Sequence, residues 1–139
     1  MRQFIVQSVD NFRMILVGDV KDKTCIILDD MSDTCGTLCK AADILQANGA
    51  KKVIGIVTHG VLSGNALERI KKTEGLEMLV VTNTIQQREN LANCDKLRCI
   101  DVTPTFAEAI RCKQERRSLD AVFEVEMFEE LSRIRCDLE

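Results

Sequence analysis

Hydrophobic and polar positions follow two different rhythms along this chain, and the changes between them mark its predicted elements. Five short apolar runs predict β-strands, at residues 14–17, 24–28, 53–58, 78–82 and 97–102. Between them, residues 37–48 and 65–72 carry apolar side chains at helical spacing, and Pro104 fits the first turn of a helix that ends near Arg111. Strands that alternate with helices are typical of an α/β fold, so we expect a mainly parallel sheet flanked by helices.

The two ends of this pattern predict further features. The turn-rich residues 18–23 separate the first two strands and can close them into an N-terminal hairpin. The strand at residues 24–28 is apolar throughout, which indicates burial on both faces, as in a parallel sheet covered by helices. Residues 112–139 are charged, with apolar side chains at three- or four-residue steps, and this predicts an amphipathic terminal helix. Periodicity leaves open whether that helix packs on this domain or on another chain.

Composition narrows the class of protein. A length of 139 residues, with 45% hydrophobic and 29% charged side chains, predicts a single globular domain. The net charge is −3 and the basic residues are scattered without aromatic neighbours, so nucleic acid is not an expected partner. No apolar run is long enough for a membrane span or a signal peptide, so we expect no membrane association and a cytoplasmic location.

The seven cysteines form an odd set with no CxxC pair. Cys35 and Cys39 are spaced one helical turn apart, which could mark a metal or redox pair. In a chain without a secretory signal, however, the pattern favours buried or half-buried free thiols.

The sequence between the strand at residues 24–28 and the following helix carries the candidate chemistry. This loop is expected at the carboxyl edge of the sheet, where open α/β folds bind ligands. A helix that starts near Gly36 offers unpaired N–H groups and the positive end of its dipole, Gly36 allows close approach, and Thr34 and Thr37 add hydroxyl donors. These features predict a phosphate site.

Asp29 and Asp30 precede that loop and suit a different part of a ligand. Their charge would repel a phosphate, but carboxylates accept hydrogen bonds from sugar hydroxyls and bind Mg²⁺. A sugar phosphate with Mg²⁺ is therefore one reading of the segment. In the other, Asp29 and Asp30 are solvated loop acids while Asp33 or Thr34 caps the helix, and the spacing alone favours neither.

A resemblance to a known family decides between these readings. The apolar strand followed by Asp29-Asp30 and then Asp33-Thr34-Cys35-Gly36-Thr37 resembles the phosphoribosyl pyrophosphate loop of the type I phosphoribosyltransferase superfamily. The flanking residues 13–23, 58–64 (Thr-His-Gly-Val-Leu-Ser-Gly) and 80–85 (Val-Val-Thr-Asn-Thr-Ile) resemble those of ribose-phosphate diphosphokinases, also called phosphoribosyl pyrophosphate synthetases. The similarity divides the chain into a divergent segment at 1–12, the C-terminal domain of the synthetase at 13–111, and the amphipathic tail at 112–139.

The resemblance implies a substrate and a reaction. Ring hydroxyls of ribose 5-phosphate would contact Asp29 and Asp30, which would also meet Mg²⁺ through those hydroxyls. The 5-phosphate would be bound by five residues: Asp33, Thr34, Cys35, Gly36 and Thr37. Members of the family transfer the β,γ-diphosphoryl group of ATP to the anomeric hydroxyl, which gives phosphoribosyl pyrophosphate and AMP.

The same resemblance implies that the chain holds only one half of the active site. In the family a preceding domain supplies the ATP pocket and a mobile basic loop, whereas here residues 1–12 precede the match and contain one basic residue, Arg2. We therefore expect no catalytic residue in this chain, and ATP binding only where a missing domain or a partner chain completes the site. A homo- or hetero-oligomer is expected, because family members assemble through both domains.

Other assignments stay open at this point. His59 could act as a general base, but the sequence favours a histidine satisfied by local hydrogen bonds, and residues 82–84 are ordinary strand-ending turn residues. The chain could instead be a non-catalytic subunit that modulates full-length synthetases, although a purely structural partner has little need for a complete phosphate segment. A small phosphoribosyltransferase is a third reading, which the flanking segments and the lack of a nucleobase hood argue against.

Overall fold

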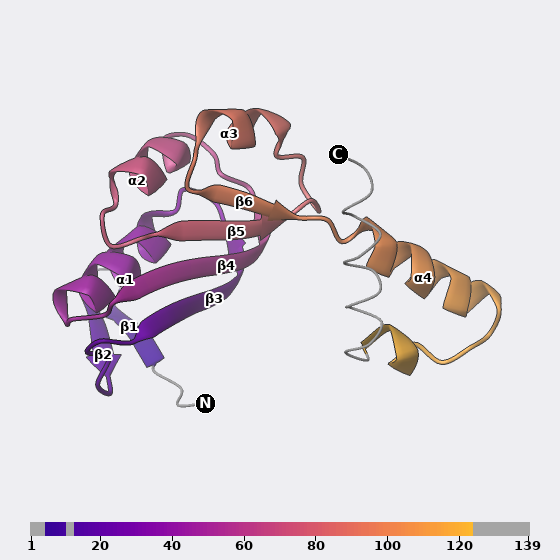
Figure 1. The fold of residues 1–139 in the computed structure, drawn as a ribbon, viewed down its shortest axis with the longest axis horizontal. Helices are drawn as coiled ribbons and strands as arrows, with labels where there is room; N and C mark the ends of the chain where they lie inside the picture. Colours follow the sequence, from indigo (N-terminus) through magenta and orange to yellow (C-terminus); the bar gives the residue numbers. More distant parts are fainter. Residues whose placement is uncertain (1–4, 11–12, 124–139) are drawn as a thin grey trace. The chain divides into compact units, whose positions relative to one another are not determined.

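The computed structural model describes residues 5–10 and 13–123, and the chain divides into two compact units, residues 1–100 and 101–139, which are described separately (Figure 1). The first unit contains, in order, β1 (Ile5–Asp10), β2 (Arg13–Val17), β3 (Thr24–Ser32), α1 (Gly36–Ala47), β4 (Lys52–Gly60), α2 (Ala66–Lys72), β5 (Met78–Thr82), α3 (Arg88–Asn93) and β6 (Leu97–Ile100). The second contains α4 (Thr103–Gln114) and the 3₁₀ turn η1 (Asp120–Phe123).

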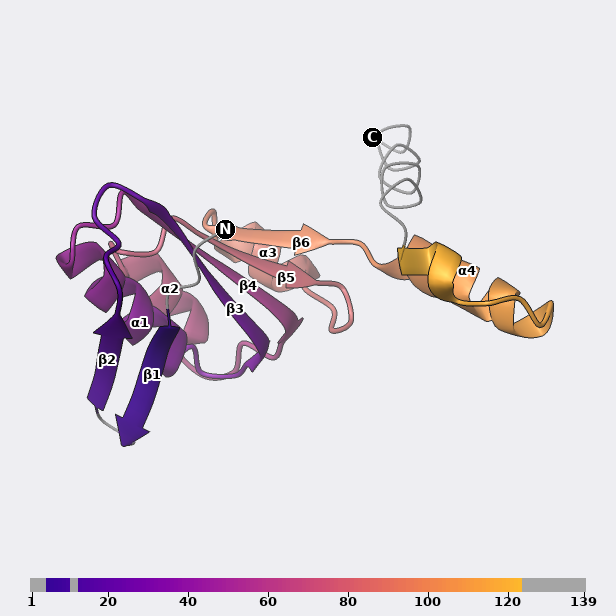
Figure 2. The same cartoon turned by 90° about the horizontal axis from the view of Figure 1, so that it is seen from below.

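Four strands of the first unit form one parallel sheet in the order β3-β4-β5-β6. Each of these strands connects to the next through a helix, and Figure 2 shows α1, α2 and α3 on the same side of the sheet. The α/β fold with a mainly parallel sheet flanked by helices is therefore confirmed. Its parallel register brings the carboxyl ends of β3 and β4 side by side, because Ser32 pairs with Gly60.

The core lies between the sheet and its helices. On the covered face, side chains such as Val53, Val57 and Leu79 are buried, and they share one apolar cluster with Leu38 of α1 and Ile70 of α2. Positions that alternate with these along β4 and β5 are only half buried, as expected for strands covered on one face. The burial pattern thus explains both the strand and the helix periodicity of the sequence.

The prediction that the strand at residues 24–28 is buried on both faces is wrong. β3 is the edge strand of the four-stranded sheet, and Ile26 and Leu28 are 54% and 78% exposed. The three helices described in the first unit, α1, α2 and α3, lie over the opposite face, so none of them covers these side chains (Figure 2). The strand also continues to Ser32, so Asp29 and Asp30 lie within it, not after it.

The N-terminal hairpin is present but joins different strands from those predicted. β1 pairs antiparallel with β2, with Ile5 opposite Val17, so part of the segment predicted as divergent is a strand. Residues 18–23 instead carry the chain from this hairpin to β3 in the other sheet. They are held there because Asp22 N–H donates to the Gly49 carbonyl (2.8 Å) and Lys51 N–H donates to the Lys23 carbonyl (2.8 Å).

Helix boundaries agree with the sequence signals in most places. α1 is followed by Gly49 at φ 88°, the left-handed stop that Asn48-Gly49 predicts, and Pro104 lies in the first turn of α4. The short helix α3 was not predicted, and none of its residues is buried. No helix among the described residues is long and apolar enough to span a bilayer.

The tail departs from the predicted continuous helix. α4 ends at Gln114, residues 115–119 are not helical, and Arg116 adopts a left-handed backbone at φ 56°. The left-handed residue breaks the helix because it turns the chain back, and η1 follows. The remainder of the predicted tail, residues 124–139, lies outside the described residues.

Candidate functional site

The loop between β3 and α1 lies at the carboxyl edge of the sheet, where the sequence predicts it. Its turn is made by Cys35, which adopts a left-handed backbone (φ 56°, ψ 11°) directly before α1. The Cys35 side chain is only 3% exposed, and its sulfur accepts a hydrogen bond from Ser32 Oγ at 3.1 Å. The loop therefore turns on a buried thiol that is bonded to the last residue of β3.

The amino end of α1 has no side-chain cap among the described residues. The alternative reading, in which Asp33 or Thr34 caps the helix, is not what the structure shows. The Asp33 carboxylate instead accepts a hydrogen bond from Ser63 Oγ. The first N–H groups of a helix have no intrahelical acceptor, so this uncapped end is a place where an anion can bind.

Gly36 is the first residue of that helix, and its surroundings are open. A Cβ placed on Gly36 would lie 3.6 Å from Arg69 Nη1 and 3.9 Å from Thr34 Oγ1, which are ordinary contact distances. Gly36 is therefore not needed to avoid a clash within the chain. The space above its Cα lies between a guanidinium and a hydroxyl, both of which donate hydrogen bonds to phosphate oxygens.

Three successive carbonyl groups of the loop are held by the segment that follows β4. The Ser32 carbonyl accepts from the N–H groups of Val61 (3.0 Å) and Leu62 (3.2 Å), and the Asp33 carbonyl accepts from Ser63 N–H (3.1 Å). The Thr34 carbonyl accepts from Arg69 Nη1 of α2 at 2.8 Å. Ser63 and Arg69 lie 30 and 35 residues from their partners in the chain, so their roles are not predicted by the spacing within the loop.

The two acids before the loop are both exposed. Asp29 Oδ1 accepts a hydrogen bond from the Asp30 N–H at 3.0 Å. Among the described residues there is no group of three or more histidine, cysteine, aspartate or glutamate side chains that could hold a metal ion. Mg²⁺ is commonly bound through one or two carboxylates plus substrate oxygens and water, so Asp29 and Asp30 fit a magnesium ion that arrives with a ligand.

His59 lies at the carboxyl end of β4, opposite Met31 of β3. Its Nδ1 is 2.8 Å from Thr84 Oγ1, and that hydroxyl in turn donates to the Thr58 carbonyl at 3.1 Å. Thr82 Oγ1 donates to the same carbonyl at 2.7 Å. The ring is thus hydrogen-bonded within the protein, as the sequence predicts, and these contacts link the carboxyl ends of β4 and β5.

The described cysteines are all free thiols, as predicted; Cys136 lies outside the described residues. Burial raises the pKa of both the Cys35 and the Cys39 thiol. A raised pKa keeps both groups protonated near neutral pH, and thiolates are the metal ligands and nucleophiles. The structure gives no support to a metal or redox pair at these two positions.

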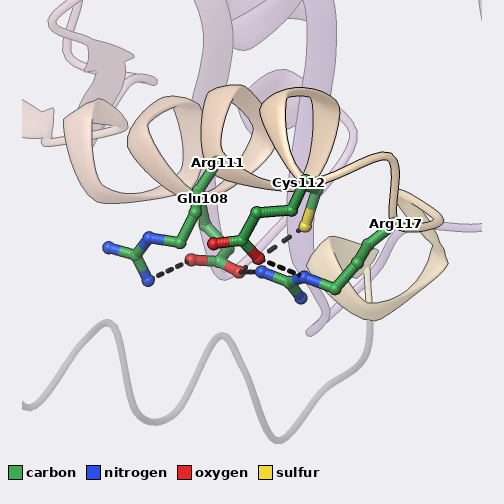
Figure 3. Close-up of polar contacts among 5 residues, drawn as sticks. Glu108, Arg111, Cys112 and Arg117 are labelled. Carbon is green, nitrogen blue, oxygen red and sulfur yellow. Dashed lines mark hydrogen bonds and ion pairs between the residues drawn. The ribbon is translucent and has the colours of Figure 1, made fainter.

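A second polar cluster lies within the unit formed by residues 101–139. Figure 3 shows Glu108 of α4 accepting hydrogen bonds from Arg111 (2.7 Å), Arg117 (3.1 Å) and Cys112 Sγ (3.5 Å). The bond from Arg117 is the main cause that lowers the pKa of Glu108. Every charge drawn in this cluster has a partner, so its role is to fasten the end of α4 to the turn that follows.

A shallow hollow at the opposite, amino edge of the sheet is lined by Lys51, Lys52 and Lys96 among other residues. Two of its three lysines are already engaged: Lys52 pairs with Glu77 at 2.6 Å, and Lys96 donates to the Thr73 carbonyl at 2.7 Å. This hollow and the uncapped end of α1 therefore lie at opposite edges of the sheet. The chemistry favours the β3–α1 loop as the candidate site.

Comparison with known proteins gives matches over most of the chain. The family model of the phosphoribosyl synthetase-associated domain matches residues 5–124. Ribose-phosphate pyrophosphokinase 3 of Saccharomyces cerevisiae is 54% identical over 111 residues, covering 80% of this chain and 34% of that protein. Ribose-phosphate pyrophosphokinase A of Dictyostelium discoideum is 49% identical over 110 residues, covering 79% and 34%.

A solved structure supports the same relationship. The crystal structure of phosphoribosylpyrophosphate synthetase from Mycobacterium smegmatis superposes with a TM-score of 0.71 at 40% identity, covering 77% of this chain and 35% of that one. The chain thus spans about a third of the length of the relatives it matches.

Proposed function

Because the chain belongs to the family of the phosphoribosyl synthetase-associated domain, we propose that its β3–α1 loop binds the 5-phosphate of ribose 5-phosphate in a ribose-phosphate diphosphokinase. The observation that carries this proposal is the uncapped amino end of α1 at the carboxyl edge of a parallel sheet. That end presents unpaired N–H groups and about half a positive charge from the helix dipole. Both favour a phosphate over a neutral ligand.

Individual side chains take different parts of the substrate in this proposal. Thr34 and Thr37 are exposed at the loop and can donate their hydroxyls to the phosphate. Asp33 acts through Ser63, since its carboxylate is bonded there and would repel a phosphate. Cys35 supplies the left-handed turn, and Gly36 leaves room for the phosphate above the helix start.

Asp29 and Asp30 take the sugar end of the substrate. Their exposed carboxylates accept hydrogen bonds from ribose hydroxyls, and Mg²⁺ would be held beside them through those same oxygens. Mg²⁺, when bound, supplies positive charge near the reacting oxygens.

The reaction we propose for the whole protein is transfer of the β,γ-diphosphoryl group of ATP to the anomeric hydroxyl, which forms phosphoribosyl pyrophosphate for nucleotide biosynthesis and releases AMP. Such transfers depend on positioning and on cations around the transferring group. This chain provides the positioning of the acceptor sugar. We assign the ATP-binding groups to a further domain or a partner chain, and the location to the cytoplasm.

Association with other chains belongs to the same proposal. Exposed apolar patches on sheets mark interaction surfaces more often than isolated apolar residues do. β3 offers such a patch with Ile26 and Leu28, beside the half-buried Ile54 and Ile56 of β4. This patch favours an oligomer, and it also suits the second candidate function, a subunit that modulates full-length synthetases.

Calorimetric titration with ribose 5-phosphate and Mg²⁺ tests the binding function. We expect the native chain to bind and Thr37→Ala to bind about tenfold more weakly, the loss of one hydrogen bond to a charged group. Thr24→Ala is the matched control, because Thr24 is an exposed threonine at the far end of β3. A folded native chain that binds no ribose 5-phosphate, or equal losses in the two variants, would contradict the proposal.

A further inference from the structure

Arg69 stands out among the charged side chains of the first unit because of what it contacts. It is an exposed residue of α2, yet its guanidinium reaches the β3–α1 loop and donates from Nη1 to the Thr34 carbonyl at 2.8 Å. The same nitrogen lies 3.6 Å from the position of a Cβ on Gly36. One guanidinium therefore touches both the loop and the first residue of α1.

The charge of Arg69 has no carboxylate partner among the described residues. By contrast, Lys52 pairs with Glu77, and Lys71, two residues after Arg69 on α2, pairs with Glu68. Acids are present at the same edge of the sheet, since Asp29 and Asp30 of β3 and Asp33 of the loop lie within five positions. Arg69 is a cation without a carboxylate partner in the described part of the chain, and it lies next to the start of α1. This position suits the binding of an anionic group.

The hydrogen bond to Thr34 has a second consequence. A carbonyl oxygen that faced the helix start would repel a phosphate, whereas the Thr34 carbonyl is turned toward Arg69. Arginine has five N–H donors in a rigid planar fork, and one bond to a carbonyl leaves the others for a ligand. Arg69 can thus hold the loop and contact a bound phosphate at the same time.

We propose that Arg69 is a binding residue for the phosphate of the sugar phosphate, adding a charged contact to the backbone N–H groups of α1. This inference rests on the proposed function of the loop and assigns to it a residue outside the contiguous segment 29–37. Its guanidinium selects a dianionic phosphate over an uncharged sugar. The bond to Thr34 keeps that guanidinium at the site before the ligand arrives.

The experiment compares Arg69→Lys and Arg69→Met with the native chain. The matched control is Arg98→Met, because Arg98 is also exposed and also donates to backbone carbonyls, those of Asp95 (2.6 Å) and Leu97 (2.8 Å), at β6. Binding of ribose 5-phosphate and of inorganic phosphate is measured by calorimetry at about 50 mM and about 200 mM salt. Circular dichroism establishes that each variant is folded.

We expect Arg69→Met to weaken ribose 5-phosphate binding about 10- to 100-fold, the effect of one charge-assisted contact, and to flatten the salt dependence. Arg69→Lys keeps the charge and is expected to lose less than about tenfold. A purely structural role would make both variants fail equally and leave the salt dependence unchanged. That result, or native affinity in Arg69→Met, overturns the inference alone, whereas a folded native chain that binds neither probe overturns it together with the proposed function.

Discussion

Gly36→Ala separates the stability of the loop from its ability to bind. Gly36 is not among the glycines with positive φ, and it is the first residue of α1, so alanine is compatible with its backbone. The new methyl group would make only ordinary contacts, at 3.6 Å to Arg69 Nη1 and 3.9 Å to Thr34 Oγ1. A compatible Gly→Ala change stabilises a protein by about 0.4–1 kcal/mol, chiefly by restricting the unfolded chain.

The same methyl group occupies the space that we assign to the phosphate. Glycine is the residue that lets a backbone approach a ligand closely, so the methyl should displace the phosphate from the helix start. The loss of one charge-assisted hydrogen bond is worth about 1.5–3 kcal/mol, or about a 10- to 100-fold rise in Kd for ribose 5-phosphate. Gly36→Ala should therefore be more stable and yet bind more weakly.

Gly49→Ala is the opposite control. Gly49 has a φ of 88° and lies between the end of α1 and the start of β4, and alanine is strained at such a φ. We expect this variant to lose about 1–2 kcal/mol of stability and to keep its affinity for ribose 5-phosphate.

Thermal unfolding and calorimetric titration measure the two effects. For a domain of about 100 residues, 0.4–1 kcal/mol raises Tm by roughly 2–8 °C. Native affinity in Gly36→Ala would refute the close approach of a phosphate to this glycine. A fall in its Tm would refute the helical geometry on which the stability estimate rests.

Three further predictions concern the cysteines and the cluster at α4. Cys35→Val should cost about 1–2 kcal/mol more stability in urea unfolding than Cys39→Val, because a β-branched residue is strained in the left-handed conformation; equal losses would contradict this. Alkylation by iodoacetamide should modify the half-buried Cys99 before Cys35 and Cys39, whose pKa values are raised by burial, and the reverse order would count against protonated thiols. The lowered pKa of Glu108 contributes stability that is present above its unfolded value of about 4.5 and is lost as pH falls through the folded pKa, so Glu108→Gln should flatten the acid limb of a pH–stability curve.

The sequence predicts the central elements well because burial on one side leaves a clear periodicity. Val53 and Val57 alternate with half-buried positions in β4, and Leu38 and Ala42 recur at helical spacing in α1. α3 was not predicted, because none of its side chains is buried and no apolar stripe marks it in the sequence. Periodicity reports packing, so an element that packs little is hard to see.

The edge strand shows a different limit. The apolar run at residues 24–28 has the composition of a strand covered on both faces, yet Leu28 is 78% exposed. Composition indicates that a surface needs to be covered, but it does not say which part of the molecule, or which partner, covers it. Only the placement of α1, α2 and α3 on one face of the sheet shows that no described element of the first unit covers Ile26 and Leu28 on the other face (Figure 2).

The residues of the candidate site also fall into two groups: those that are close together in the sequence and those that only the fold brings together. The segment from Asp29 to Thr37 is contiguous, so its spacing and its resemblance to a known loop are visible in the sequence. Ser63 and Arg69 contact it only because parallel pairing brings the carboxyl ends of β3 and β4 together. The spacing of residues within the loop does not indicate either of them.

The contributions from distant residues explain how the loop can be ready for a phosphate before one is bound. The carbonyls of Ser32, Asp33 and Thr34 all accept hydrogen bonds from residues 61–69, so three successive acceptors are turned toward that segment. Successive N–H groups that face one side of a turn form an anion-binding concavity. A loop already fixed in this form loses little conformational freedom on binding, which raises affinity without any additional contact. The segment after β4 is therefore as much a part of the phosphate site as the loop whose sequence reveals it.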